Sequence, residues 1–105
     1  MHFVAHALDK PDAIERRLAI LASHRAYLAE APGRFGVTIL LSGPLTTDDA
    51  ETIIGSFLLI EADDRQSAEA LFAGEPMVEA QIWAAFHLHA VTLRQNAMQD
   101  ASGAT

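Results

Sequence analysis

Residues 53–61 read IIGSFLLIE, a short apolar run that predicts a β-strand. Side chains in a strand alternate between its two faces, so Phe57 and Leu59 share one face of this strand. Leu58 and Ile60 share the other face. Because both faces are apolar, the sheet that contains this strand needs cover on both sides.

The stretches on either side of this strand predict further elements in the order β-α-β-β-α-β. Such an order makes the ferredoxin-like α+β fold, in which both helices cover one face of a four-stranded antiparallel sheet. The other face is left open, and a second copy of the chain, packed sheet against sheet, is the simplest cover. The expected strands are residues 2–8, 37–41, 53–61 and 81–93, and the expected helices are residues 11–30 and 65–73, with one helical turn ending at residue 80.

Prolines, glycines and aspartates mark the ends of these elements. Pro32 is expected to end the first helix, and Gly43-Pro44 is expected to end the second strand before a polar loop at residues 45–52. A short side chain with an oxygen acceptor suits the start of a helix. The aspartates expected to cap the helices are Asp9 or Asp12 for the first and Asp63 or Asp64 for the second.

The composition indicates one folded domain. The chain has 105 residues, of which 50% are hydrophobic and 20% are charged. This is enough for a single hydrophobic core. The apolar periodicity ends near residue 93, so we expect a domain at residues 1–93 and a flexible tail at residues 94–105.

The charge and the missing residue types exclude several classes of function. Fourteen acidic residues against seven basic ones give a formal net charge of −7, which argues against binding to a nucleic-acid backbone. The chain has no cysteine, so disulfides, thiolate catalysis and cysteine-ligated metals are excluded. We see no apolar run of membrane-spanning length and no signal-peptide pattern, and expect a cytoplasmic protein without a membrane partner.

His24 and Arg17 fall on the apolar stripe of the first expected helix. At about 100° per residue, both project into the sector that holds Leu18, Leu21 and Leu28. Buried polar groups need hydrogen-bond partners or a wet cavity. His24 is therefore a candidate general acid and base, and Arg17 a candidate for holding an anionic group of a ligand. Alternatively, His24 is a core histidine bonded to a backbone carbonyl, and Arg17 reaches solvent at the margin of the helix.

Glu75 lies in a Gly-Glu-Pro turn after the second expected helix. The proline restricts Glu75 to an extended backbone and the glycine permits a sharp reversal, so the carboxylate is held in a fixed orientation. Such a carboxylate can orient an imidazole, whereas the alternative is an ordinary exposed turn glutamate. Gly43 and Pro44 either let a ligand approach the backbone closely or only end the strand.

Four histidines are expected to converge on the first and last strands, which are neighbours in this fold. They are His2 and His6 on one face of the first strand and His87 and His89 on one face of the last. A zinc, copper or nickel site is conceivable there, but the spacing matches no metal motif and no carboxylate accompanies it. We expect these histidines to line a dimer interface or a polar cavity, and include His6 among the candidate substrate-binding residues. Neither a metal nor a cofactor is expected.

A series of short motifs runs in order along nearly the whole chain, from about residue 1 to residue 92. They are Phe3-Val4, Asp9-Lys10-Pro11, Glu15-x-Arg17-Leu18, His24-x-x-x-Leu28, Ser42-Gly43-Pro44, Gly55-Ser56, Ser67-Ala68-Glu69-Ala70 and Gly74-Glu75-Pro76. As an ordered set they resemble the YciI-like (YCII-related) proteins. The resemblance implies a ferredoxin-like fold that pairs into a dimeric α+β barrel, in agreement with the open sheet face.

The same resemblance implies an active-site dyad: a histidine on the first helix and an aspartate in an Asp-Pro turn after the second. The histidine corresponds to His24 and the aspartate to Glu75, which is one methylene longer. The Glu75 carboxylate must therefore fold back, or the histidine must shift. Met77 stands where the family usually has an aromatic residue. Wider relatives of the barrel include cofactor-free monooxygenases, lactone isomerases and dehydrohalogenase-type lyases, a likeness of fold alone.

Two functions are consistent with these residues. The first is a small dimeric enzyme, independent of a cofactor, that performs acid–base chemistry on a small anionic or ring-derived molecule. In it His24 moves a proton, Glu75 fixes the tautomer of the imidazole and Arg17 helps to position negative charge. The alternative is a non-catalytic dimeric domain that binds a small ligand, in which the dyad serves the structure.

Overall fold

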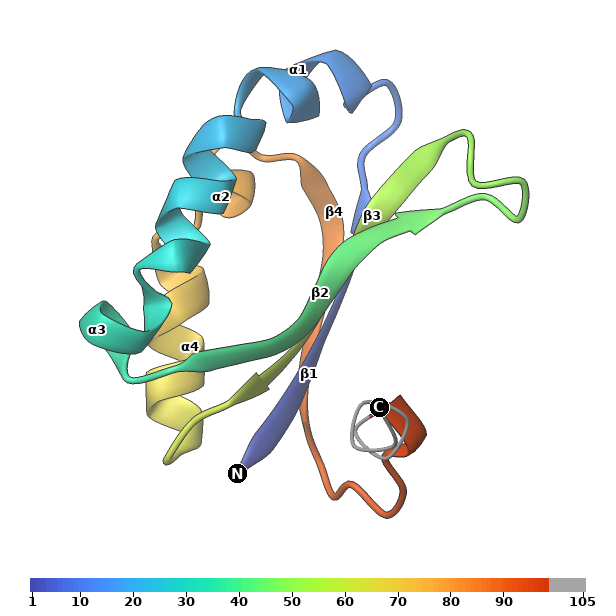
Figure 1. Cartoon of the computed structure of the whole chain (residues 1–105). Coiled ribbons are helices and arrows are strands. Elements are labelled where there is room, and N and C mark those ends of the chain that lie inside the picture. The colour runs from blue at the N-terminus through green and yellow to red at the C-terminus, as the bar shows by residue number, and fades with distance from the viewer. Residues whose placement is uncertain (99–105) are drawn as a thin grey trace.

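The elements of the computed structural model, which describes residues 1–98, place the strands in one antiparallel sheet. The strands are β1 (His2–Asp9), β2 (Thr38–Thr46), β3 (Ile53–Glu61) and β4 (Trp83–Val91), and the helices are α1 (Ile14–Ala19), α2 (Leu21–Ala29), α3 (Ala31–Phe35), α4 (Arg65–Ala73) and α5 (Pro76–Glu79). The strand order is β2-β3-β1-β4, with β1 paired to both β3 and β4 (Figure 1). The prediction of a ferredoxin-like α+β fold is confirmed.

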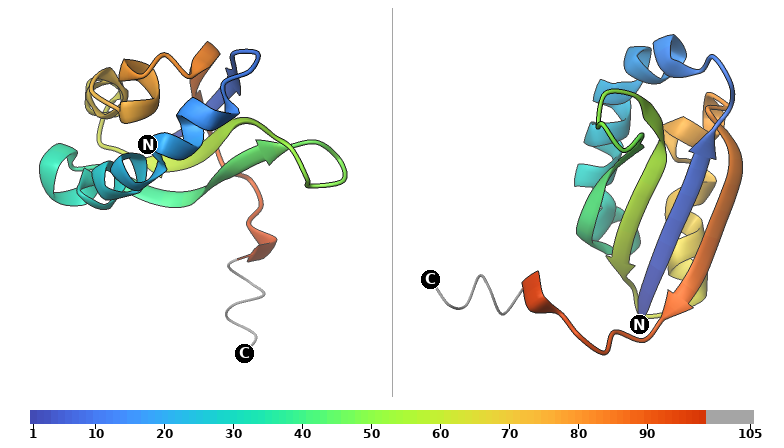
Figure 2. Two further views of the ribbon diagram at one scale, coloured as in Figure 1. Left: turned by 90° about the horizontal axis from the view of Figure 1, so that it is seen from above. Right: turned by 90° about the vertical axis from the view of Figure 1, so that its right-hand side faces the viewer.

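Helices α1 to α5 lie on one face of the sheet, as the views along and across it show (Figure 2). The core lies between the two layers, where Phe3 of β1 and Leu58 of β3 face Leu71 and Phe72 of α4. Sheet and helix each bury one apolar face against the other, which is the main stabilising term of such a fold. The other large apolar side chains that are fully buried are Val37, Ile60, Met77 and Ile82.

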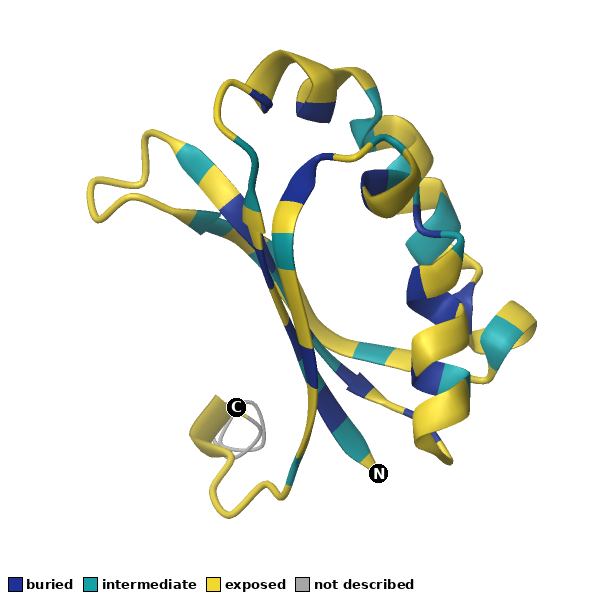
Figure 3. Cartoon of the chain, turned by 180° about the vertical axis from the view of Figure 1, so that it is seen from behind, coloured by how far each residue is buried: buried dark blue, intermediate teal, exposed yellow. Residues whose placement is uncertain are grey.

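The opposite face of the sheet carries apolar side chains beside several histidines, and these side chains are exposed or only partly buried (Figure 3). Phe57 and Leu59 alternate with the buried Leu58 and Ile60 along β3, as strand geometry requires. Phe57 and Leu59 are only half-buried, and Leu41 on the neighbouring β2 is 39% exposed. The expectation that this strand carries apolar residues on both faces is confirmed.

The helix expected at residues 11–30 is broken. Helices α1 and α2 meet at Ile20, whose backbone leaves the helical region (φ −106°, ψ 6°) and whose N–H bonds the carbonyl of Arg17, three residues back. The break reorients α1, so that Leu18, which was expected on the apolar stripe, is 56% exposed. Periodicity read along one straight helix was therefore wrong for its first turns.

Two prolines that were expected to end elements lie inside them. Pro32 stands in the first turn of α3, where the missing N–H has no helical partner to lose. Pro44 lies within β2, which continues through Gly43 to Thr46 instead of ending at Leu41. This is tolerated because β2 is an edge strand, with β3 on one side only.

Other boundaries agree more closely. The strand expected at residues 53–61 and the helix expected at 65–73 match β3 and α4 residue for residue. The last strand is shorter than expected, beginning at Trp83 and ending at Val91. Residues 99–105 of the expected tail lie outside the described residues, so its flexibility stays a prediction. No helix among the described residues is both long enough and apolar enough to cross a membrane.

Asp64 caps α4 by accepting a hydrogen bond from the Ser67 N–H at 2.8 Å, as the sequence predicts, whereas α1 has no side-chain cap. The Ser67 bond lowers the pKa of the Asp64 carboxyl. A carboxyl with a lowered pKa in the folded state stabilises the fold above its unfolded pKa and loses that contribution as the pH falls.

We therefore expect the melting temperature of the unaltered protein to fall more than that of Asp64→Asn between about pH 6 and pH 3. Asparagine can still cap the helix but does not titrate, so the difference between the two curves isolates this carboxyl. Thermal unfolding followed by circular dichroism measures it, and parallel curves would contradict the prediction.

Candidate functional site

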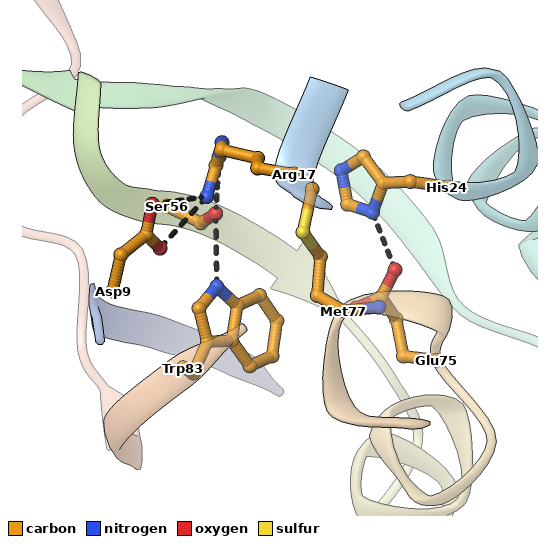
Figure 4. Close-up of polar contacts among 7 residues, drawn as sticks. All are labelled: Asp9, Arg17, His24, Ser56, Glu75, Met77 and Trp83. Carbon is orange, nitrogen blue, oxygen red and sulfur yellow. Dashed lines mark hydrogen bonds and ion pairs between the residues drawn. The ribbon is translucent and has the colours of Figure 1, made fainter. Parts of the chain in front are cut away.

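The His24 imidazole on α2 contacts the Glu75 carboxylate in the turn before α5 (Figure 4). The contact joins Nδ1 of His24 to Oε1 of Glu75, across 51 residues of sequence. The Glu75 side chain is fully buried, and the His24 side chain is 13% exposed. The structure thus brings together the two residues proposed as a dyad.

The Glu75 carboxylate is fixed from two sides. Its Oε2 accepts the backbone N–H of Met77 at 3.0 Å, which makes Glu75 the N-cap of α5. Its backbone is extended (φ −69°, ψ 132°), the conformation that Pro76 enforces on the preceding residue. Of the two expected ways to accommodate the extra methylene, the side chain takes the first: it folds back over the first turn of α5.

This geometry sets the roles of the two imidazole nitrogens. When the Glu75 carboxyl is ionised it can only accept hydrogen bonds, and Nδ1 of His24 then donates to it. A neutral imidazole with its proton on Nδ1 has an unprotonated Nε2, which can accept a proton or a hydrogen bond. His24 lines a cavity, described below.

Arg17 is buried in a second polar cluster, close to the first (Figure 4). Its Nη1 donates to both carboxylate oxygens of Asp9, at 2.8 and 3.0 Å, and its Nη2 donates to Ser56 Oγ at 2.8 Å. The indole Nε1 of Trp83 donates to the same Ser56 Oγ at 3.2 Å. Burial raises the pKa of the Asp9 carboxyl, and the Arg17 guanidinium opposes that rise. The charge of Arg17 is therefore balanced within the protein.

The sheet register explains why these side chains meet. Asp9 pairs with Trp83 across β1 and β4, and Ser56 pairs with Ala7, two residues before Asp9. Residues two apart in a strand share a face, so Asp9 and Ser56 both project toward the helices, where Arg17 reaches them from α1.

A cavity of about 330 Å³ lies between the helices and the edge of the sheet. His24, Arg17, Gly43, Pro44 and Ser56 line it, together with apolar residues of α2 and β3 such as Leu21 and Leu58. Four of the six predicted site residues thus surround one cavity. Glu75 is not part of the cavity wall and acts on it only through His24.

His6 is not brought to this cavity. It lies opposite His87 in the β1–β4 pairing, on the open face of the sheet, with the cavity on the helix side. The rings of His87 and His89 stack at 6.2 Å between centroids, while His2 contacts Glu61 at 3.4 Å. Among the described residues, no group of three or more His, Cys, Asp or Glu side chains is arranged to hold a metal ion.

Ser56, Asp9 and Trp83 were not predicted as site residues. Asp9 was expected only as a possible cap of the first helix. One signal was available for Ser56: it shares the core-facing side of β3 with Leu58 and Ile60, where a polar residue needs a partner.

The model of the YCII-related domain family matches residues 1–91. The chain belongs to the YCII-related family. Protein YciI of Escherichia coli O6:H1 is 30% identical to this YCII-related chain over 90 residues, covering 79% of this chain and 88% of that protein. An uncharacterised protein of Haemophilus influenzae is 30% identical over 89 residues, covering 80% of this chain and 89% of that protein. The predicted family is confirmed.

Solved structures with the same fold include two named enzymes. One is 5-chloro-2-hydroxyhydroquinone dehydrochlorinase (TftG) from Burkholderia phenoliruptrix, in complex with 2,5-dihydroxybenzoquinone. It matches the YCII-related chain with a TM-score of 0.75 and 26% identity, over 88% of this chain and 94% of that chain. The other is SnoaB, a cofactor-independent oxygenase from Streptomyces nogalater, with a TM-score of 0.52 and 15% identity over 90% and 93%. At that identity the second match shows the fold alone.

Proposed function

We propose that this YCII-related protein is a small acid–base enzyme in which His24 moves a proton on a small ring-derived molecule. The observation that carries the proposal is the contact between the His24 imidazole, at the wall of the cavity, and the fully buried Glu75 carboxylate behind it. A histidine oriented by a buried carboxylate, with its second nitrogen available to a ligand, is the arrangement that general base catalysis requires. The proposed reaction uses no cofactor.

In this proposal Glu75 is a positioning residue. It holds the proton of His24 on Nδ1, so that Nε2 is the proton acceptor, and it stabilises the imidazolium that forms when His24 takes a proton. The bond from Met77 keeps the carboxylate in place while the imidazole changes charge. A positioned general base contributes roughly 10²- to 10⁴-fold to rate.

Arg17 has a different role from the one expected. Its charge is paired with Asp9, so it does not offer a free cation to an anionic group. We propose that it instead fixes the cavity wall at Ser56. Gly43 and Pro44 form another part of the wall, where the absence of a side chain at Gly43 leaves room for a ligand.

The cavity size and the TftG likeness together support a ring-derived ligand. A volume of about 330 Å³ is at the small end of ordinary ligand sites, which suits a single substituted ring. The TftG structure contains 2,5-dihydroxybenzoquinone, a ring that bears carbonyl and hydroxyl oxygens. We propose that the substrate belongs to this class of oxygenated ring.

We also propose that two copies pack through the open face of the sheet. The support is the apolar surface of that face, which includes Phe57, Leu59 and the exposed Leu41. Sheet-against-sheet packing would bury these side chains and the histidines beside them, so His6 would be an interface residue and not a substrate-binding one.

The test is turnover of 5-chloro-2-hydroxyhydroquinone, followed by chloride release. We expect His24→Gln to lower kcat/KM by about 100-fold or more, because glutamine cannot act as the base. Glu75→Gln should lower kcat by a similar factor, since an amide does not stabilise the imidazolium. His2→Gln, on the other face of the sheet, is the matched control and should leave turnover unchanged.

The alternative function makes a different prediction. If the domain only binds a ligand, the unaltered protein turns over neither this compound nor related oxygenated rings, and His24→Gln lowers only the melting temperature. A variant His24→Gln that retains the full turnover of the unaltered protein would overturn the enzyme proposal.

A further inference from the structure

Ser56 is the residue from which we draw a further inference. We propose that its hydroxyl is the hydrogen-bond donor of the cavity and that it selects ligands which present an oxygen acceptor, such as a ring carbonyl or a phenolate. The inference rests on the proposed function only in placing a ligand in this cavity. It adds a recognition group that faces the ligand from the sheet, opposite the histidine on α2.

The first step is a count of hydrogen-bonding positions on Ser56 Oγ. A serine hydroxyl has two lone pairs and one hydrogen. Arg17 Nη2 and Trp83 Nε1 both bond to this oxygen, at 2.8 and 3.2 Å. A guanidinium and an indole N–H can only donate. Both lone pairs are therefore occupied, and the hydroxyl hydrogen must be directed to a third partner.

The second step is that residues 1–98 supply no such partner. Among residues 1–98, the Ser56 side chain makes no hydrogen bond besides these two. The residue is only 3% exposed, so bulk solvent does not serve this hydrogen freely. Ser56 does line the cavity that His24 and Arg17 line. A buried hydroxyl hydrogen without an acceptor is unfavourable, and the cavity is where an acceptor can be placed.

The third step is that the polarity of this group is fixed. A free serine can rotate to donate or to accept, whichever a ligand requires. Ser56 cannot, because accepting from a ligand would displace Arg17 or Trp83 from its lone pairs. The positive charge of Arg17 also draws electron density from Oγ, which makes the hydroxyl a stronger donor. The residue therefore favours oxygen acceptors and rejects N–H groups at the same position.

Ser56 and His24 are complementary in the proposed reaction. His24 Nε2 accepts a proton from a C–H or O–H of the ligand, and the electron pair of that bond stays with the ligand. In a ring ketone this pair forms a carbon–carbon double bond and displaces the carbonyl π pair onto oxygen, which becomes an enolate. A hydroxyl donor already aimed at that oxygen stabilises the charge as it forms. The proton is then on His24, and the negative charge is on the ligand oxygen that Ser56 contacts.

Trp83 gives a direct reporter of this contact. It is the only tryptophan of the chain, so its indole N–H gives a single cross-peak in a ¹⁵N-labelled sample. This N–H is bonded to the same oxygen that we propose contacts the ligand. An acceptor that polarises the Ser56 hydroxyl therefore changes the chemical shift of the indole N–H.

The experiment measures binding of 2,5-dihydroxybenzoquinone by calorimetry, together with the Trp83 indole cross-peak, in the unaltered protein. We expect saturable binding and a shift of the cross-peak. A ring of similar size that presents N–H donors, 1,4-phenylenediamine, should bind at least about tenfold more weakly. If the quinone fails to bind, or binds without moving the indole peak, the proposal is overturned.

Two variants complete the test. Ser56→Ala should weaken quinone binding about tenfold, and Ser56→Thr, which retains the hydroxyl, should restore most of it. Equal affinities of Ser56→Ala and the unaltered protein would overturn the proposal. If Ser56→Ala does not fold, the cross-peak and the diamine comparison still decide the question. Binding that depends on Ser56 without any turnover would reject the enzyme function alone, whereas turnover that depends on His24 and not on Ser56 would reject this inference alone.

Discussion

Replacing Asp9 with alanine is expected to lower the free energy of unfolding by about 3–5 kcal/mol. The Asp9 carboxylate is the only charged partner of Arg17 among residues 1–98, and both side chains are nearly fully buried, with 8% and 6% exposed. Without Asp9, the guanidinium keeps its charge at every pH at which the protein folds. The whole penalty of burying an unpaired cation therefore falls on the folded state, out of a typical total stability of about 5–15 kcal/mol.

Removing the other partner should have a different dependence on pH. In Arg17→Met the Asp9 carboxyl loses the guanidinium that holds its pKa down, while the burial that raises this pKa remains. When the pKa of a carboxyl is higher in the folded state than in the unfolded state, the protonated carboxyl stabilises the folded state. This contribution is fully present below the unfolded pKa. That contribution is lost as the pH rises through the folded pKa. The defect of Arg17→Met should thus shrink toward about pH 4, whereas the defect of Asp9→Ala should not.

Chemical denaturation at about pH 4 and pH 8 measures both effects. The double variant Asp9→Ala/Arg17→Met closes the cycle, and we expect it to be more stable than Asp9→Ala because neither charge is left unpaired. A loss below about 1 kcal/mol in Asp9→Ala would mean that water in the cavity solvates Arg17 as well as Asp9 does.

Gly55→Ala is expected to lower the free energy of unfolding by about 3 kcal/mol, at the upper end for overpacking. A Cβ on Gly55 would lie 2.1 Å from the carbonyl oxygen of Ala7 and 3.1 Å from Cδ1 of Leu45. The first of these neighbours is backbone, in the strand pair β1–β3, and it cannot move aside as a side chain can. The central part of the sheet must therefore shift, and Ser56, the next residue, must shift with it.

Gly33→Ala is the matched control. A Cβ on Gly33 meets nothing within 4 Å, and the residue lies in helix α3. Alanine there should raise the free energy of unfolding by roughly 0.5–1 kcal/mol, because it favours the helix and costs no space. Denaturation midpoints compare the two variants. If Gly55→Ala were as stable as the unaltered protein, the close approach of β1 to β3 at this point would be refuted.

Local pattern was a good guide wherever neighbouring residues decide the structure. The apolar run of β3 and the amphipathic residues of α4 were predicted to the residue, because period and breakers agree there. The Gly-Glu-Pro turn likewise indicated a carboxylate in a fixed orientation, since Pro76 restricts the backbone of Glu75 in any fold.

Pattern failed where packing overrides local preference. No proline or glycine lies at the break at Ile20, so the sequence gives no signal for it. The break nevertheless determines which side chains of α1 are buried. Pro44 is compatible with a strand only because β2 lies at the edge of the sheet. The local sequence does not determine the order of the strands.

The sequence by itself determined the fold class, the family and the presence of a histidine and a carboxylate at His24 and Glu75, because these depend on periodicity, on breakers and on ordered motifs. Only the tertiary structure decided that Asp9 neutralises Arg17, that Ser56 joins Arg17 to Trp83, and that His6 faces away from the cavity. The reason is physical: these outcomes depend on strand register and on contacts between residues far apart in the chain. A sequence shows which side chains need partners, and the register decides which partners they find.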